Sequence, residues 1–334
     1  MKSSQLQLCS RPEGHPSAEN FSMVHVDLPE LKEGQILVRN EFLTVDPYMR
    51  GRMNNVKSYV PPFELNQPLE GGAVGFVVES KNSAFKVGEP VLSGFGWRDL
   101  WVAEPKGVIS LKNMEDYPLS WALGTLGMPG LTAWSGLHKV GALQPNETVF
   151  VSGAAGAVGS IVGQLAKAHG ARVIGSAGSQ AKVDWLKEIG FDEVINYQKQ
   201  PIRKALAEVT AKGIDLYFDN VGGSHLEAAI DRMNVKGRIV LCGAIEQYNQ
   251  LERPSGPDNM IMIVGKQLSL KGFIVSSYNT YHNQFQEDVR GLIGKGQVTV
   301  QETVSEGLDQ MVNAFLGLFS GHNTGKAIVK LSLN

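Results

Sequence analysis

A short glycine-rich segment is the part of this sequence whose residue types most clearly suggest chemistry. The apolar residues 149–151 run into the small residues of segment 152–159, and residues 160–167 then have helical character. A strand, a turn without large side chains and a helix that begins at the turn present free backbone N–H groups and the positive helix end to an anion. The segment therefore predicts a seat for the pyrophosphate of a dinucleotide.

The match of this segment to the G-x-G-x-x-G pattern is incomplete. Ala154 stands where the first glycine is expected, whereas Gly156 and Gly159 hold the other two places. Glycine-rich turns also serve as plain tight connections between a strand and a helix. The elements that follow must decide between these two interpretations.

The charge of the next segment indicates which nicotinamide cofactor is bound. A site for NAD places an acidic residue about 20 positions beyond the glycines, where it holds the ribose 2′-hydroxyl. Residues 176–180 contain no acid, and Lys182 opens the next expected helix, where a cation is unfavourable unless an anion neutralises it. Lys182 alone is equally compatible with an exposed surface lysine. The missing acid and the nearby base together favour NADP(H).

Alternating strand and helix patterns surround these residues. Strands are expected at 172–175, 193–196, 216–219 and 238–243, with helices at 181–189 and 226–233. Such alternation is typical of parallel βαβ units with right-handed crossovers. It predicts a doubly wound α/β nucleotide-binding domain over residues 124–300.

The residues ahead of this domain have a different pattern. Strands are expected at 35–43, 75–80 and 90–94, separated by turns rich in Pro and Gly. This pattern predicts a β-rich, partly open barrel domain over residues 1–123. A helix at 285–293 and a final strand at 325–331 follow the nucleotide domain, and we expect residues 301–334 to return to the first domain.

Composition and charge exclude several other classes of protein. The 31 basic and 33 acidic residues give a net charge of −2, so no nucleic-acid or anionic-membrane partner is expected. No apolar run is long enough to span a bilayer and the N-terminus lacks a signal-peptide core, which favours a cytoplasmic location. Because Cys9, Cys242 and the seven histidines show no metal-ligand spacing, no metal site is expected.

Several separated motifs resemble the zinc-independent branch of the medium-chain dehydrogenase/reductase family. These motifs are Asp46–Met53, Leu126–Trp134, Ala154–Gly159, Asp219–Gly223 and Cys242–Ile245. The resemblance extends nearly end to end, and within the branch it is strongest to prostaglandin reductases, plant alkenal double-bond reductases and bacterial curcumin reductases. It implies a Rossmann domain with a GroES-like domain, and reduction by NADPH of a carbon–carbon double bond conjugated to a carbonyl group.

The zinc-dependent branch of the same family is disfavoured. Its members carry a cysteine ligand and a Gly-His-Glu segment where this sequence has Val45-Asp46 and Gly71-Gly72. Polarisation of the carbonyl group by a metal is therefore not expected, and a hydrogen-bond donor of the protein must replace it.

The resemblance also implies a set of cofactor-binding residues. Gly156, Ala157, Val158 and Gly159 would contact the pyrophosphate, and Lys182 and Tyr197 would hold the 2′-phosphate near Gly178. The rest of the cofactor would be lined by Asn220, Cys242, Gly243, Ala244, Ile245, Tyr248, Phe273, Ile274, Val275 and Asn323.

The reaction itself requires a proton donor. Hydride transfer to the β-carbon of an enone places negative charge on the carbonyl oxygen, so the site needs a donor for the enolate and then a proton for the α-carbon. A tyrosine stays protonated at neutral pH, and the resemblance places Tyr248 near the nicotinamide ribose. We therefore predict that Tyr248 orients the cofactor and the enolate. The alternative is that Tyr248 only packs over its loop, and water is an equal source of the final proton.

The sequence indicates several residues for the substrate pocket, each of which has an alternative role. The resemblance places Tyr48 at the substrate pocket and Met128, with Thr132, near the nicotinamide, although packing and core filling are plain alternatives for Tyr48 and Met128. Arg50 and Arg52 suit an acidic substrate or ordinary ion pairs equally well. Plant relatives carry a tyrosine near the position of Gly72, so this pocket is expected to admit larger or more varied enones. A quinone reductase, or a non-catalytic NADPH-binding protein, is the alternative function.

The last expected strand of the nucleotide sheet, residues 267–275, alternates polar and apolar residues. An unprotected edge strand tends to pair with another copy of the chain, and members of the family commonly dimerise in this way. We therefore expect a homodimer.

Overall fold

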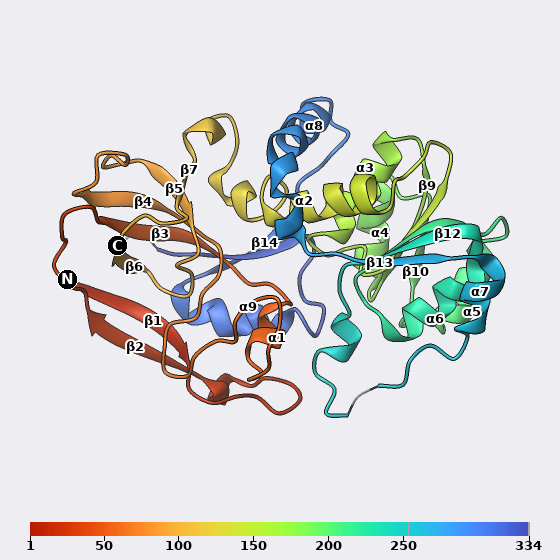
Figure 1. Cartoon of the computed structure of the whole chain (residues 1–334), viewed down its shortest axis with the longest axis horizontal. Coiled ribbons are helices and arrows are strands. Elements are labelled where there is room, and N and C mark those ends of the chain that lie inside the picture. Colours follow the sequence, from red (N-terminus) through yellow and green to blue (C-terminus); the bar gives the residue numbers. More distant parts are fainter. Residues whose placement is uncertain (253, 333–334) are drawn as a thin grey trace. The chain divides into compact units, whose positions relative to one another are not determined.

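The structure is a computed structural model that describes residues 1–252 and 254–332. They form two compact units, whose elements are shown in Figure 1. Unit 1 comprises Met1–Leu123, Glu302–Asn323 and the residues from Ala327 onward, and unit 2 comprises Gly124–Gln301 and Thr324–Lys326. Unit 1 is therefore assembled from early and late parts of the sequence.

Unit 2 is built on a six-stranded sheet in the order β10-β9-β8-β11-β12-β13, with parallel pairing throughout. Its strands are β8 (Thr148–Val151), β9 (Arg172–Ala177), β10 (Glu193–Asn196), β11 (Ile214–Asp219), β12 (Met233–Leu241) and β13 (Ser269–Gly272). Parallel strands covered on both faces are apolar throughout, and every residue of β8 is buried. The strand order runs outward in two directions from β8 and β11, so the carboxyl ends of these two strands form the topological switch point.

Helices connect the consecutive strands of this sheet, as Figure 1 shows. They are α3 (Gly159–Ala168), α4 (Gln180–Glu188), α5 (Ile202–Val209), α6 (Gly223–Arg232) and α7 (Ile261–Lys266). Two further helices, α2 (Met128–Ser135) and α8 (His282–Gly294), are joined by a hydrogen bond of 2.9 Å from Trp134 Nε1 to Asp288 Oδ2. This is the doubly wound arrangement that the alternating patterns predict.

The predicted last strand, residues 267–275, is too long. Only Ser269–Gly272 pair with β12, Gln267 takes a positive φ of 52° at the end of α7, and the 3₁₀ helix η6 (Val275–Tyr281) begins soon after the strand. The cause is the neighbouring strand: β12 ends at Leu241, which lies opposite Gly272, so the residues beyond have no partner in the ladder. The predicted edge position of this strand is correct.

Unit 1 contains an antiparallel pair, β1 (Lys2–Leu8) and β2 (Phe21–Asp27), and a larger sheet of seven strands. The order of the larger sheet is β14-β15-β3-β4-β5-β7, with β6 also paired to β3. Its strands are β3 (Ile36–Thr44), β4 (Ala73–Ser80), β5 (Pro90–Ser93), β6 (Leu100–Ala103), β7 (Ile109–Ser110), β14 (Glu302–Glu306) and β15 (Lys326–Lys330). The strands expected at 35–43, 75–80 and 90–94 are thus β3, β4 and β5, and the expected final strand is β15, antiparallel to β3.

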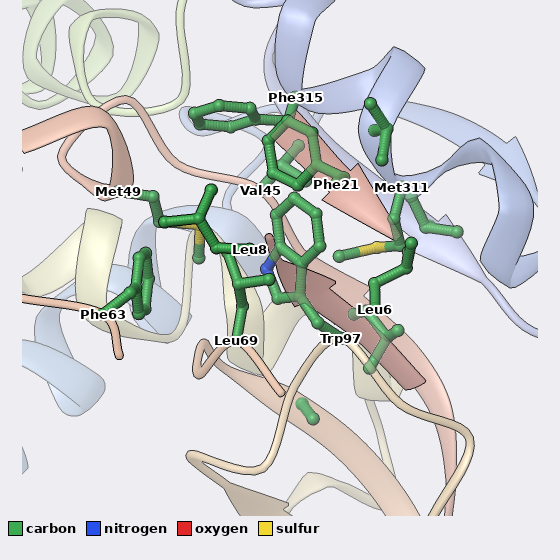
Figure 2. Packing of buried hydrophobic residues seen from close by; sticks show 14 of the residues in the cluster. Leu6, Leu8, Phe21, Val45, Met49, Phe63, Leu69, Trp97, Met311 and Phe315 are labelled. Atoms are coloured by element: carbon green, nitrogen blue, oxygen red, sulfur yellow. The ribbon is translucent and has the colours of Figure 1, made fainter. Parts of the chain in front are cut away.

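A buried apolar core holds the short helix α1 (Met49–Arg52) and the helix α9 (Met311–Gly317) within unit 1 (Figure 2). The Trp97 ring stacks on Phe21 with 5.7 Å between ring centroids, and it meets the ring of Phe315 edge-on at 5.9 Å. Met49 is fully buried in this core, and Tyr48 packs against it. Burial of one large apolar side chain contributes roughly 1.5–3 kcal/mol, so the core fixes the start of α1 and with it Tyr48.

Candidate active site

The turn between β8 and α3 contains Gly156 and Gly159 in the expected places, and a further glycine, Gly153, in a place that the pattern does not expect. Gly153 has a φ of +57°, so the residue that permits the turn precedes the position at which the pattern expects its first glycine. In the described part of the chain, the backbone N–H groups of Ala157 and Val158 have no hydrogen-bond partner. Both residues immediately precede a ten-residue helix, and an anion at the start of the helix would satisfy their N–H groups. The turn therefore fits a pyrophosphate.

Gly159 has no room for a side chain. A Cβ atom there would lie 2.4 Å from the carbonyl oxygen of Gly153 and 2.8 Å from the Cα of Ala154, which are backbone atoms that cannot move aside. We expect Gly159→Ala to destabilise unit 2 by roughly 1–3 kcal/mol and to lower the melting temperature by roughly 2–6 °C, measured by circular dichroism. Gly291→Ala in α8 is the control, because a Cβ atom at Gly291 would have no atom within 4 Å and alanine favours helix. Equal melting temperatures for the two variants would contradict this account.

The segment that follows β9 forms the corner where a 2′-phosphate is expected. Ser179 caps α4, and its Oγ accepts the backbone N–H of Lys182 at 3.4 Å. Lys182 thus lies in the first turn of the helix, and partial burial lowers its pKa. A cation that is partly desolvated and close to the positive end of a helix is stabilised by a bound anion. Residues 176–180 bring no acidic side chain to this corner.

Tyr197 lies against Gly178 at the same corner. The two residues follow the adjacent strands β10 and β9, and a Cβ atom on Gly178 would be 2.7 Å from Tyr197 Oη. Burial, and then the charge of Glu246, raise the pKa of Tyr197, so its hydroxyl stays a neutral donor at physiological pH. Gly178 and Tyr197 are therefore neighbours in space, as a shared phosphate site requires.

A pocket of about 750 Å³ lies at the carboxyl ends of β11, β12 and β13. Its volume is in the range of small-molecule sites. Six residues predicted to bind the cofactor line it: Cys242, Gly243, Ala244, Tyr248, Phe273 and Ile274. Ile245 and Val275 begin the 3₁₀ helices η5 (Ile245–Gln247) and η6 and are not among the described lining residues, whereas Tyr278 lines the pocket without having been predicted.

Tyr248 folds back over the loop that precedes it. Its hydroxyl accepts the backbone N–H of Ala244 at 3.4 Å, and a Cβ atom on Gly243 would be 3.2 Å from Tyr248 Oη. Because a hydroxyl that accepts a hydrogen bond still carries a proton to donate, the contact with Ala244 is compatible with a loop anchor and with a proton donor in the pocket.

Asn220, the predicted cofactor residue after β11, is held by Ser152. The backbone N–H of Asn220 donates to Ser152 Oγ at 3.0 Å, and its side-chain amide donates to the carbonyl oxygen of Ser152 at 2.8 Å. Asp219, the residue before it, is 1% exposed. Sequence analysis included Ser152 in the glycine-rich segment and Asp219 in a family motif, but it assigned neither residue a role of its own. The signal that could have found them is their position, since Ser152 follows β8 and Asp219 ends β11 at the switch point.

Met128 and Thr132 lie on α2 of unit 2. The Met128 side chain is 41% exposed, so it does not fill the core of unit 2, while Thr132 is buried and its Oγ1 donates to the carbonyl oxygen of Met128 at 2.8 Å. The late segment Thr324–Lys326 also belongs to unit 2, where the N–H of Gly325 donates to the carbonyl oxygen of Ala155 at 2.8 Å. Asn323, predicted to bind the cofactor, immediately precedes this segment and belongs to unit 1.

Tyr48, predicted to bind substrate, also lies in unit 1 and precedes α1. It is half-buried, and burial, reinforced by the charge of Asp46, raises its pKa well above the usual value. The phenol of Tyr48 is therefore neutral at physiological pH.

Arg50 and Arg52 follow Tyr48 and are buried. Arg50 donates to the carbonyl oxygen of Gly14 and to Asn54 Oδ1, each at 2.8 Å. Arg52 Nη2 lies 2.6 Å from Glu70 Oε2, and its guanidinium lies 4.1 Å from the centre of the Phe63 ring. Both arginines therefore bind neighbouring loops of unit 1. The contact of Arg52 with Glu70 is an ion pair, as one of the two sequence interpretations has it, whereas these contacts of Arg50 are hydrogen bonds to neutral groups.

Two negative findings concern the described residues. No group of three or more His, Cys, Asp or Glu side chains is gathered there so as to hold a metal ion. None of the helices in that part of the chain has both the length and the hydropathy to cross a bilayer.

Comparison with known proteins gives consistent matches over both units. A family model described as the N-terminal domain of oxidoreductase matches residues 4–111, and one described as zinc-binding dehydrogenase matches residues 157–294. Prostaglandin reductase 1 of Bos taurus is 43% identical over 95% of this chain and 95% of its own length. The NADP(+)-dependent 2-alkenal reductase of Nicotiana tabacum is 41% identical over 96% and 94%.

A solved structure extends this likeness to the fold. CurA of Vibrio vulnificus in complex with NADPH is 38% identical to this chain, covers 99% of it and 100% of its own chain, and superimposes with a TM-score of 0.95. The predicted fold class, a doubly wound α/β domain with a β-rich GroES-like domain, is confirmed by this match.

Proposed function

This chain belongs to the medium-chain dehydrogenase/reductase family, and on that premise we propose that it reduces the carbon–carbon double bond of α,β-unsaturated ketones and aldehydes with NADPH. The predicted family is confirmed, and the protein is an NADP-dependent oxidoreductase. The substrate class, the roles of the site residues and the assembly are proposals.

The residues of unit 2 fit NADPH from end to end. The unpaired N–H groups of Ala157 and Val158 suit the pyrophosphate, and Lys182 with Tyr197 suits the 2′-phosphate. The pocket at the carboxyl ends of β11, β12 and β13 suits the nicotinamide half. NADPH supplies a hydride when it is bound there.

The chain's own contribution to the reaction is to stabilise the negative charge on the substrate oxygen and to supply protons. Tyr248 lines the pocket, and its hydroxyl would donate a hydrogen bond to the substrate carbonyl oxygen as this oxygen becomes an enolate. Tyr48 and Met128 would contact the substrate, and the proton for the α-carbon would come from Tyr248 or from water. The observation that carries the proposal is the pocket lined by Tyr248 at the carboxyl ends of β11, β12 and β13 of a nucleotide-binding sheet.

One assay tests the proposed function. NADPH oxidation is followed by stopped flow with an enone such as 3-nonen-2-one, with a naphthoquinone and with a saturated ketone. We expect the enone to be the best acceptor and the saturated ketone to be inert. Preference for the quinone would favour a quinone reductase, tight NADPH binding without turnover would favour a non-catalytic protein, and turnover of the saturated ketone alone would exclude reduction of a double bond.

A thiol in a pocket for electrophilic enones must be unreactive. Burial, and then the charge of Asp219, raise the pKa of Cys242 to about 12. Because the thiolate is the nucleophile, a fraction of only about 10⁻⁵ is reactive at pH 7, and this fraction rises about tenfold per pH unit. We expect N-ethylmaleimide to modify Cys9 well before Cys242 at pH 7, measured by peptide mass spectrometry. Modification of Cys242 as fast as Cys9 would refute this expectation.

We also propose a homodimer built on the edge strand β13. The strand lies at one end of the sheet order, and the neighbouring helix α7 exposes Ile261 and Val264, which are 75% and 72% accessible. An open strand edge beside exposed apolar residues favours pairing with a second copy. Analytical ultracentrifugation should give twice the chain mass, and a monomer mass would contradict the proposal. The cytoplasmic location and the absence of a nucleic-acid partner stay predictions.

A further inference from the structure

One buried carboxylate receives hydrogen bonds from three places at the switch point of unit 2. Asp219 Oδ1 accepts Ser152 Oγ at 3.0 Å and Tyr217 Oη at 2.6 Å. The same oxygen accepts the backbone N–H groups of Val221 and Gly222 at 2.9 and 2.8 Å. Hydrogen bonds to a charged acceptor are roughly twice as strong as neutral ones, so this carboxylate ties the end of β8 to the loop after β11.

The backbone of Asp219 binds a third segment, the residues that follow β12. Its carbonyl oxygen accepts the N–H groups of Cys242 and Gly243 at 2.9 and 3.1 Å, just beyond the end of β12. Parallel strands lose their regular ladder where they end, and the backbone groups exposed there need partners. Asp219 supplies these partners for the loops that carry the proposed cofactor contacts Asn220 and Cys242.

Ser152 completes the arrangement from β8. Its hydroxyl donates to Asp219 and accepts the N–H of Asn220 at 3.0 Å, and it lies 2.9 Å from the Tyr217 hydroxyl. All three side chains are buried, with exposures of 0% for Ser152 and Tyr217 and 1% for Asp219. Asp219 lines the pocket, whereas Ser152 and Tyr217 are not among the described lining residues.

We propose that Asp219, together with Ser152, is a positioning residue for NADPH, which sets the loops 220–222 and 242–243 in the geometry that the cofactor requires. The inference rests on the proposed function, because it takes NADPH as the ligand of these loops. It assigns a role to two residues to which sequence analysis gave none, and it predicts that their loss weakens the binding of NADPH more than it slows hydride transfer.

The test compares two variants with a matched control on the same strand. Asp219→Asn keeps the shape of the side chain and removes its charge, and Ser152→Ala removes one hydroxyl. The control is Asp215→Asn, because Asp215 lies at the other end of β11, where it accepts the N–H of Thr148 at 2.8 Å and Asn234 Nδ2 at 2.7 Å. The NADPH dissociation constant is measured by cofactor fluorescence without any acceptor, and kcat is measured at saturating NADPH.

We expect both variants to raise the NADPH dissociation constant about tenfold with kcat within about threefold of wild type, as lost positioning of a binding loop requires. Asp215→Asn should lower the melting temperature but leave the NADPH dissociation constant within about twofold. If either folded variant binds NADPH as tightly as wild type, the positioning role is refuted. If Asp219→Asn does not fold, the NADPH dissociation constant of Ser152→Ala alone tests the positioning role. A wild-type protein that binds no NADPH would instead overturn the proposed function.

Discussion

Replacement of Tyr248 by phenylalanine is expected to lower kcat for enone reduction by roughly 100-fold, the usual loss when one donor to a developing oxyanion is removed. The ring stays, so the packing over the loop Gly243-Ala244 is kept, while the hydrogen bond of 3.4 Å from Ala244 is lost with the hydroxyl. The NADPH dissociation constant should therefore change by less than about threefold. Steady-state kinetics with 3-nonen-2-one and cofactor fluorescence give the two quantities.

Tyr278→Phe is the matched control for this prediction. Tyr278 lines the same pocket and meets the ring of Phe273 edge-on at 5.9 Å, but it has no proposed role in the reaction. Its loss of one hydroxyl should leave kcat nearly unchanged. If Tyr248→Phe turned over enones at the wild-type rate, Tyr248 would only pack over its loop, which is the alternative role given in the sequence analysis. Water would then be the better candidate for the proton donor.

Replacement of Lys182 by alanine is expected to raise the KM for NADPH by roughly 10- to 100-fold, because a hydrogen bond to a charged group contributes about 1.5–3 kcal/mol. The KM for NADH should change by less than about threefold, since NADH carries no 2′-phosphate for the lysine to bind. The preference for NADPH over NADH would therefore fall by the same factor. Initial rates with both cofactors and one enone measure it.

A second lysine on the same helix provides the control. Lys187 is exposed near the end of α4 and takes no part in the proposed site. Lys187→Ala should leave the KM values for NADPH and NADH unchanged. Added salt should weaken NADPH binding in the wild-type protein more than in Lys182→Ala. An unchanged cofactor preference in Lys182→Ala would mean that Lys182 is the plain surface lysine of the alternative interpretation.

Local patterns predicted most elements of unit 2 well, although β12 begins at Met233 and ends at Leu241, whereas the strand was expected at 238–243. The strands expected at 172–175 and 193–196 and the helix at 181–189 differ from β9, β10 and α4 by at most two residues at either end, because short apolar runs mark the strands and Gly190 follows the helix. The strand expected at 267–275 was too long, since its length depends on where its neighbour β12 stops. A single segment of sequence does not contain that information.

The residues of the candidate site divide in the same way, into those that local sequence identifies and those whose role depends on contacts with distant parts of the chain. Gly156 and Lys182 were identified from spacing and charge alone, and Tyr248 from the resemblance. Asp219 was missed as a separate residue because its importance comes from hydrogen bonds to Ser152 and to the backbone of Cys242, which are far from it in the sequence. Gly153 was missed because the pattern counts glycines and does not say which one must take a positive φ.

The pairing of β3 with β15 has a consequence for the folding of the protein during its synthesis on the ribosome. The strands β8 to β13 follow one another along the chain, so the nucleotide sheet can assemble as synthesis proceeds. The larger sheet of unit 1 cannot be finished then, since β3 is synthesised before the strands of the nucleotide sheet and must wait for β15, which is synthesised after them. Contacts between distant parts of a chain form slowly, and waiting strands expose edges that aggregate. Nascent chains truncated before β15 should therefore depend on chaperones for the first unit much more than for the second.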